Sequence, residues 1–251
     1  MISKPTRLLV LAVFLLFPLG AQAQNFNDIE PGKDTYSANK TVNPIVIDGD
    51  LSEWTGAEVL ADPRFYIPKF SGSDVNVDGE LVNFEILGNG DWTGPDDHTS
   101  AVRVLYDDDN VYFGFVVTDE YHENAANSAW NGDSVQLMVA NGERDTQVAL
   151  YNYALGGVED ALADETIVNH EARPEGGDDT EAIVSRNVET KRTIYEIRLP
   201  KSAMGLEDLS AGVKFGLGMA INDGDEATPG QKGWGGLGAH SIVFGKHPAE
   251  T

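Results

Sequence analysis

Hydrophobic and polar residues alternate over short segments along most of the chain, a pattern typical of half-buried β-strands. The clearest pair covers residues 101–106 and 111–117, where β-branched and aromatic residues flank a polar turn. Weaker signals predict strands at 45–47, 81–87, 134–140, 146–153, 181–188, 193–199, 213–221 and 241–244. Stretches at 61–100 (apart from 81–87) and at 156–180 are polar and predict loops. The pattern therefore predicts an all-β fold, an antiparallel sandwich or barrel with long polar loops.

The N-terminus has a different pattern. Lys4 and Arg7 precede an apolar run at 8–19, and Ala21 and Ala23 place small residues at a cleavage site. This arrangement predicts a signal peptide over residues 1–23. The alternative is a membrane anchor, but the run falls short of the roughly 20 apolar residues that a spanning helix needs. We expect a secreted protein, extracellular or periplasmic and not inserted in a membrane, with a polar lead-in at 24–43 and one domain over 44–251.

The charge balance narrows the choice of ligand. The chain holds 17 basic and 41 acidic residues, and loss of the signal leaves 15 basic residues and a net charge of −26. Such a surface repels nucleic acid and anionic lipid, and suits neutral ligands or divalent cations. There is no cysteine, so no disulfide contributes to stability.

Several turns carry two or more carboxylates, among them those at 48–50, 107–109 and 223–226. Calcium prefers six to eight oxygen ligands, and such turns supply them, although none has EF-hand spacing. We take Asp48, Asp50 and Asp133 as candidate ligands of a structural Ca²⁺. The alternative is that these are solvated turns of an acidic protein.

Catalytic signatures are missing from the sequence. There is no GxSxG, HExxH, P-loop or haem-attachment motif, and the five histidines are scattered. With so many carboxylates, the sequence cannot single out a glycosidase pair. We therefore expect a binding domain, with the question of an enzyme left open.

The four tryptophans offer a more specific signal, because an indole ring can stack on the apolar face of a sugar. Trp130 lies between a polar loop and a predicted strand, and Trp234 lies among glycines that would leave its ring uncovered. We expect these two to form sugar platforms, with core burial as the alternative for Trp130. Trp54 is expected in the core, and the choice between core and platform stays open for Trp92.

Five segments, taken in order, resemble carbohydrate-binding module family 9 and its relatives. They are residues 47–54 (IDGDLSEW), 105–119 (LYDDDNVYFGFVVTD), 130–137 (WNGDSVQL), 195–200 (YEIRLP) and 215–223 (FGLGMAIND). The resemblance covers residues 44–245. It implies a jelly-roll-like β-sandwich, usually with bound calcium.

Members of that family are found attached to xylanases and related enzymes of plant-polysaccharide breakdown. The resemblance implies an oligo- or polysaccharide held between two tryptophans, here Trp130 and Trp234. Asn222 and Gln136 occupy matching positions near the ligand. It also implies association with a polysaccharide-degrading enzyme in plant or algal polysaccharide catabolism.

The sequence departs from the family pattern at three places. Gln136 replaces a glutamate, residues 147–150 lack an expected arginine, and Ala220 replaces a glutamine. Losing charged groups removes charge-assisted hydrogen bonds to hydroxyls. The pocket could bind a different sugar, bind weakly, or bind none. The chain also reaches Thr251 without the usual final strand, which fits a shortened domain or a piece of a longer protein.

Two other functions remain open. A related branch of the superfamily holds a b-type haem for electron transfer, and Met138, Met219, His122 and His240 could supply axial ligands. A glycoside hydrolase would instead need two carboxylates about 5–10 Å apart in a cleft.

Overall fold

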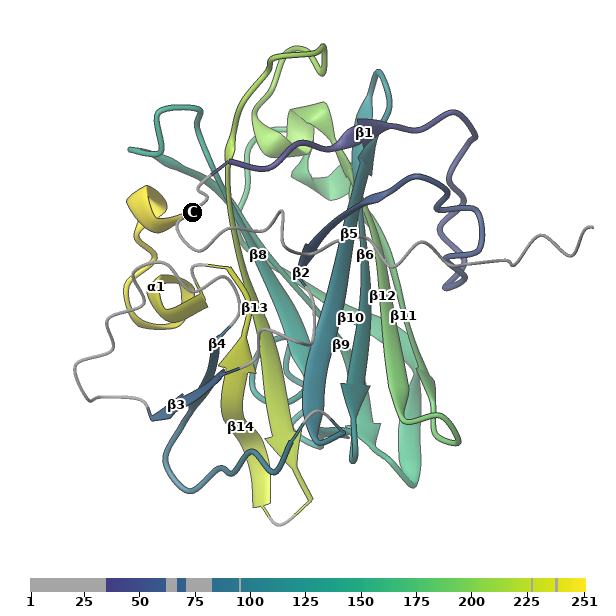
Figure 1. Cartoon of the computed structure of the whole chain (residues 1–251), viewed down its shortest axis with the longest axis vertical. Coiled ribbons are helices and arrows are strands. Elements are labelled where there is room, and N and C mark those ends of the chain that lie inside the picture. Colours follow the sequence, from purple (N-terminus) through teal and green to yellow (C-terminus); the bar gives the residue numbers. More distant parts are fainter. Residues whose placement is uncertain (1–34, 62–66, 71–82, 95, 227, 238) are drawn as a thin grey trace, which may run out of the picture. The chain divides into compact units, whose positions relative to one another are not determined.

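The computed structural model describes residues 35–251, except 62–66, 71–82, 95, 227 and 238. The predicted signal peptide at 1–23 and the start of the lead-in lie outside the described residues. The described strands form two sheets (Figure 1). The first sheet has the order β1–β5–β6–β12–β11, with β2 also paired to β5; the second has the order β10–β9–β8–β13–β14–β4–β3, with β7 paired to β9.

The first sheet contains β1 (Asn39–Lys40), β2 (Glu58–Ala61), β5 (His98–Tyr106), β6 (Asn110–Asp119), β11 (Glu181–Asn187) and β12 (Arg192–Pro200). The second contains β3 (Ile67–Phe70), β4 (Asn83–Ile86), β7 (Glu123–Asn124), β8 (Ser134–Ala140), β9 (Gln147–Val158), β10 (Ala161–Ala172), β13 (Gly216–Asp225) and β14 (Thr228–Gly235). Helix α1 spans Ala239–Phe244, and short 3₁₀ turns cover Gly177–Asp179, Lys201–Met204 and Pro248–Glu250. Among the described helices, none is long and apolar enough to cross a bilayer.

The main core lies between the two sheets. In β8, Val135, Leu137 and Val139 point into this core, together with Phe113 and Phe115 of β6 on the facing sheet. Successive side chains of a strand point to opposite faces, so one face of each strand supplies the core. The prediction of an all-β sandwich is confirmed, since most neighbouring strands pair antiparallel and β1–β5 and β3–β4 pair parallel.

The β5–β6 hairpin confirms the strongest sequence signal. Tyr106 pairs with Val111, and the intervening turn is held by the Asp107 carboxylate, which accepts hydrogen bonds from the backbone N–H groups of Asp109 at 2.8 Å and Asn110 at 2.7 Å. An aspartate at the start of a turn favours this geometry because its short side chain reaches the backbone two residues on.

A second, smaller core covers part of the outer face of the second sheet. Met138, Leu150 and Trp234 pack there with Ile242 of α1. Helix α1 lies beside β13 (Figure 1), where the Ile242 side chain would touch any Cβ added at Gly218. This helix-covered patch borders the candidate site described below.

Four expectations for local structure were wrong. Residues 45–47 form no strand, although Ile45 is buried in a small cluster with Trp54 and Tyr112. The predicted strand at 241–244 belongs to α1, most of the predicted loop at 156–180 is β10, and β3 lies within the predicted loop at 61–100.

Candidate functional site

Trp130 lies in the loop between β7 and β8, and 46% of its surface is exposed. Hydrogen bonds from polar side chains hold the backbone of this loop in place. Asn222 of β13 donates a hydrogen bond to the Trp130 carbonyl at 3.2 Å and another to Ser134 Oγ at 2.8 Å. Ser128 Oγ accepts from the backbone N–H of Asn131 at 3.2 Å. A large apolar ring is thus held at the surface by a backbone that is itself well anchored.

Gly132 shows why the chain can turn so tightly here. Its φ is +131°, a region that residues with a side chain rarely adopt, and an added Cβ would lie 2.4 Å from the Glu123 carbonyl oxygen. The glycine lets the loop pass directly over β7 before β8 begins.

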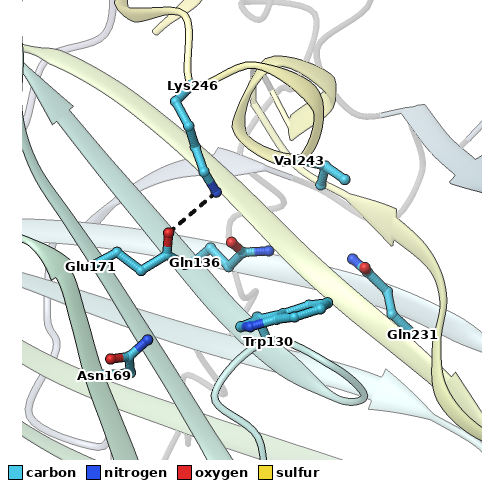
Figure 2. A pocket seen from close by; sticks show the side chains of 7 residues that line it. All are labelled: Trp130, Gln136, Asn169, Glu171, Gln231, Val243 and Lys246. Atoms are coloured by element: carbon cyan, nitrogen blue, oxygen red, sulfur yellow. Dashed lines mark ion pairs between the residues drawn. The ribbon is translucent and has the colours of Figure 1, made fainter.

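The Trp130 ring borders a pocket of about 390 Å³ on the outer face of the second sheet (Figure 2). The loop, β8, β10, β14 and the segment from α1 onward all contribute to its lining, which consists of Trp130, Gln136, Asn169, Glu171, Gln231, Val243 and Lys246. An aromatic face combined with several amides is the composition of a site for a neutral polar ligand.

The amides at the floor are connected to one another. Asn222 Oδ1 accepts hydrogen bonds from Gln231 Nε2 at 2.7 Å and from Gln136 Nε2 at 3.4 Å. Gln136 pairs in register with Asn152 of β9 on one side and with Ala220 of β13 on the other. Ala220 is fully buried in the helix-covered patch that borders the pocket.

The pocket also contains one ion pair. Lys246 Nζ lies 3.6 Å from Glu171 Oε2, and Figure 2 shows the lysine extending toward the glutamate. Both side chains are about one-third exposed. Glu171 is further oriented by Asn152 Nδ2, which donates to its Oε1 at 2.8 Å. The family pattern expects charged groups at position 136 and within residues 147–150, which carry none here. The charged groups of this pocket come instead from β10 and from the segment after α1.

His170 lies between two residues of the lining but on the other face of β10. Its ring meets the Tyr151 ring edge-on at 4.8 Å between centroids. Burial, and after it the nearby Arg173 guanidinium, lowers the pKa of His170 below its usual value. His170 therefore packs against the main core on the face of β10 opposite the pocket.

The expectation that Trp234 is an uncovered platform is wrong. Its ring is fully buried in the helix-covered patch, where Phe244 of α1 packs edge-on at 5.5 Å and Glu85 accepts a hydrogen bond from Nε1 at 3.2 Å. The neighbouring glycines do not expose the ring. A Cβ at Gly233 would lie 2.4 Å from the Phe84 ring, so the glycine is needed for close packing.

The other residues singled out in the sequence lie in the pocket lining, beneath it or outside it. Trp130 and Gln136 line the pocket, whereas Asn222 is 1% exposed and supports it from beneath. Trp54 is in the core, as expected, and its Nε1 donates to Glu196 at 2.9 Å. Trp92 is half-buried, with its Nε1 donating to the His98 carbonyl at 2.9 Å.

Sequence reasoning missed five lining residues: Asn169, Glu171, Gln231, Val243 and Lys246. Asn169 and Glu171 were hidden because β10 looked like a loop. Their spacing of two, with His170 between them, was the available signal for one face of a strand.

A sequence profile described as "Carbohydrate family 9 binding domain-like" matches residues 80–239, which is more than half of the chain. The chain belongs to the carbohydrate family 9 binding domain-like family. The family resemblance is thereby confirmed, and the match covers four of the five segments, all except 47–54. No curated protein matches the chain.

Two solved structures resemble this family 9-like domain in fold. Both are carbohydrate-binding modules of family 9 from Caldicellulosiruptor kristjanssonii. The complex with cellotriose has 14% sequence identity and a TM-score of 0.55, covering 85% of this chain and 89% of that one. The complex with glucose has 15% identity and a TM-score of 0.55, covering 84% and 90%.

The three candidate calcium ligands of this family 9-like domain do not form one site. Asp48 and Asp50 are exposed on a turn whose backbone N–H groups bind Glu196 of the first sheet. Asp133 is buried and bonded to the backbone of Glu123 and Gly224 in the second sheet. Calcium at the turn that contains Asp48 stays a prediction.

Asp133 instead belongs to a buried group with Asp119 and His122. Burial, and secondarily the charge of Asp223, raises the pKa of Asp119 to about 7. Burial lowers the pKa of His122 to about 4. Desolvated carboxylates this close together are stable when a cation or a proton neutralises part of their charge.

The geometry gives little support to the two other functions. Met138 packs under α1 and Met219 lies in the main core, so the two methionines are on opposite faces of the second sheet, and neither they nor His122 line the pocket. The side chain of His240 lies outside the described residues. Glu171 is the one carboxylate in the described lining, whereas glycoside hydrolysis uses a pair.

Proposed function

We propose that this protein is a non-catalytic carbohydrate-binding domain that holds a neutral sugar ring against Trp130. The observation that carries the proposal is the exposed Trp130 ring, fixed by its loop, at the edge of a pocket lined with amides. The C–H face of a pyranose is apolar and can cover the indole, while its hydroxyls meet Gln136, Gln231 and Asn169.

The free energy gained by stacking a sugar on Trp130 is large enough to make a measurable difference to the affinity. Covering about 80 Å² of apolar indole surface at about 25 cal/mol per Å² contributes about 2 kcal/mol, or roughly 30-fold in affinity. Because one tryptophan stacks on the sugar in place of two, we expect a dissociation constant between micromolar and millimolar. This corresponds to a binding free energy of about 4 to 8 kcal/mol.

Glu171 and Lys246 give the pocket its charge-assisted hydrogen bonds. A carboxylate accepts from a sugar hydroxyl and an ammonium donates to one, and each such bond is stronger than a neutral one. Because these two groups come from elements different from those expected, they would favour a different orientation of the sugar from that in family members with two stacking tryptophans.

The choice of sugar to test first comes from the relatives. The two family 9 structures are complexes with cellotriose and with glucose. We therefore propose β-glucan oligosaccharides as the first ligand class and xylo-oligosaccharides as the second. The positive run, apolar stretch and small residues at 1–23 support export, where a polysaccharide and its degrading enzyme would be encountered.

Calorimetric titration of the mature domain with cello- and xylo-oligosaccharides tests this proposal. We expect saturable 1:1 binding by the wild type, partial affinity in Trp130→Phe, and a loss of roughly 30-fold or more in Trp130→Ala. The control is Trp92→Phe, which alters a half-buried indole outside the pocket lining and should bind as the wild type does. A folded wild type that gives no heat with any of these sugars would contradict the proposal.

A further inference from the structure

A second polar cluster, none of whose members lines the pocket, lies where the end of β6, the start of β7 and the start of β8 meet. Asp119 ends β6, His122 immediately precedes β7, and Asp133 immediately precedes β8. All three are buried, and one potential ligand atom from each lies within 4.8 Å of the others. The His122 Nδ1 and Asp133 Oδ2 atoms are 3.4 Å apart, a separation that two bonds of about 2.0–2.2 Å to one ion span.

The hydrogen bonds of His122 show which nitrogen is available. Its Nε2 lies 2.9 Å from the Leu155 carbonyl oxygen, which can only accept, so Nε2 carries the proton. In the neutral ring, which burial favours, Nδ1 then presents a lone pair. Nδ1 has no hydrogen-bond partner among the described residues and lies 3.4 Å from Asp133 Oδ2. Two lone pairs facing each other indicate that a cation or a proton belongs between them.

The carboxylates are held in place by backbone groups. Asp133 accepts from the N–H of Glu123 at 2.6 Å and from the N–H of Gly224 at 2.9 Å, and Asp119 accepts from the N–H of Tyr121 at 2.9 Å. These bonds fix the direction of each carboxylate, as outer partners do for metal ligands.

The surroundings leave excess negative charge in the cluster. Asp223 is buried nearby, its Oδ2 has no hydrogen-bond partner among the described residues, and its other oxygen lies 3.0 Å from His98 Nδ1. Arg186 lies 3.8 Å from Asp119 but is held more closely by Glu159 at 2.8 Å. Lys191 also pairs with Glu159 at 2.6 Å, so two cationic side chains face four carboxylates, those of Asp119, Asp133, Glu159 and Asp223, which favours an additional cation.

We propose that Asp119, His122 and Asp133 bind a divalent transition-metal ion, with zinc as the first candidate. An imidazole nitrogen together with carboxylate oxygens is a zinc-type ligand set, and His122 already has the carbonyl partner on its second nitrogen that such ligands usually have. Calcium is disfavoured because it takes six to eight oxygen ligands and avoids imidazole. The ion would tie the ends of three strands together and is independent of sugar binding.

The test is metal binding by the untagged mature domain. Because the site is buried, the chain is unfolded in chelator, refolded with Zn²⁺, Mn²⁺, Ca²⁺ or Mg²⁺, and dialysed, and its metal content is measured by mass spectrometry. We expect one zinc per chain, a higher unfolding temperature in zinc than in chelator, and zinc favoured over calcium at least tenfold. In Asp119→Asn and His122→Gln the zinc affinity, measured against a chromophoric chelator, should fall at least tenfold.

The matched control is Glu196→Gln. Glu196 is also a fully buried carboxylate, but its hydrogen bonds go to the backbone of Asp48 and to the Trp54 indole, not to the cluster. Its substitution should lower stability and leave zinc affinity unchanged. Folded wild-type chain without stoichiometric metal would overturn the proposal and assign a shared proton to the cluster. Calcium binding that Asp119→Asn weakens and His122→Gln does not would overturn the choice of a transition metal.

Discussion

At the scale of single residues, two tryptophans of similar sequence context have opposite roles. Trp130 is 46% exposed and Trp234 is fully buried, although both stand beside glycine or small polar residues. The exposure of each indole ring depends on which side chains pack against it. Phe244 and Ile242 of α1 cover Trp234, whereas the Trp130 ring stays exposed at the edge of the pocket.

This contrast predicts different effects of truncation. Trp234→Ala removes a buried indole from the small core under α1 and should lower the free energy of unfolding by about 3–5 kcal/mol. Trp130→Ala removes a half-exposed ring and should change it by less than about 1 kcal/mol. Denaturant unfolding of both variants checks this. Equal losses of stability would show that Trp130 is also a packing residue.

His170 gives the pocket wall a defined pH dependence. Its pKa in the folded chain is lowered by burial and then by Arg173, so between that pKa and about 6.5 the unfolded chain binds more protons. The contribution of His170 to stability should therefore rise with pH across this window and be constant above it. His170→Gln should reduce the gain in unfolding free energy between about pH 5 and 7.5; an identical pH profile would contradict the shift.

At the scale of elements, the loop before β8 depends on Gly132. Gly132→Ala would combine an unfavourable φ with a clash against the Glu123 carbonyl. We expect it to lower stability by about 2–4 kcal/mol and to weaken sugar binding at least tenfold, because the Trp130 backbone must shift.

Gly56→Ala is the matched control for that variant. Gly56 also has a positive φ, of +77°, but an added Cβ there would meet nothing within 4 Å. It should cost only about 1 kcal/mol and leave binding unchanged. Thermal unfolding and calorimetry of the pair separate backbone strain from the clash, and equal effects of the two substitutions would contradict the account.

The elements also show what the sequence could reveal. Strands β5, β6 and β8 were predicted closely because one face of each is apolar and lies in the main core. Strand β10 was missed because it lies at the edge of its sheet with mostly exposed side chains, so no apolar alternation marks it. Helix α1 resembled a strand because Ile242 and Val243 are β-branched, and a six-residue segment has too few turns to show a helical period.

Only part of the candidate site could be predicted, because some of its residues belong to elements that the sequence pattern did not reveal. Trp130 and Gln136 lie on or beside a predicted strand, and the family resemblance pointed to them. Glu171 and Lys246 come from the missed strand and from the segment after α1, so only tertiary structure brings them to the pocket. The burial of Trp234 could not be foreseen without knowing where α1 packs.

At the scale of the whole molecule, the large negative charge should affect stability more than sugar binding. The full chain carries a net charge of −24, so repulsion within the folded state is screened as salt is added. We expect the unfolding temperature to rise by a few degrees between about 20 mM and 500 mM NaCl, while the Kd for a neutral oligosaccharide changes less than about twofold. A strong loss of sugar affinity with salt would indicate a charged ligand.

The most direct test of sugar binding at Trp130 is a proton–nitrogen NMR titration that follows the four indole N–H signals while cellotriose is added. The account predicts a saturable shift of the Trp130 signal, with the Trp54 signal, bonded to Glu196 in the core, unmoved. A spectrum in which the Trp130 signal stays still at high concentrations of every oligosaccharide tested, from a folded chain, would contradict the proposed site and function.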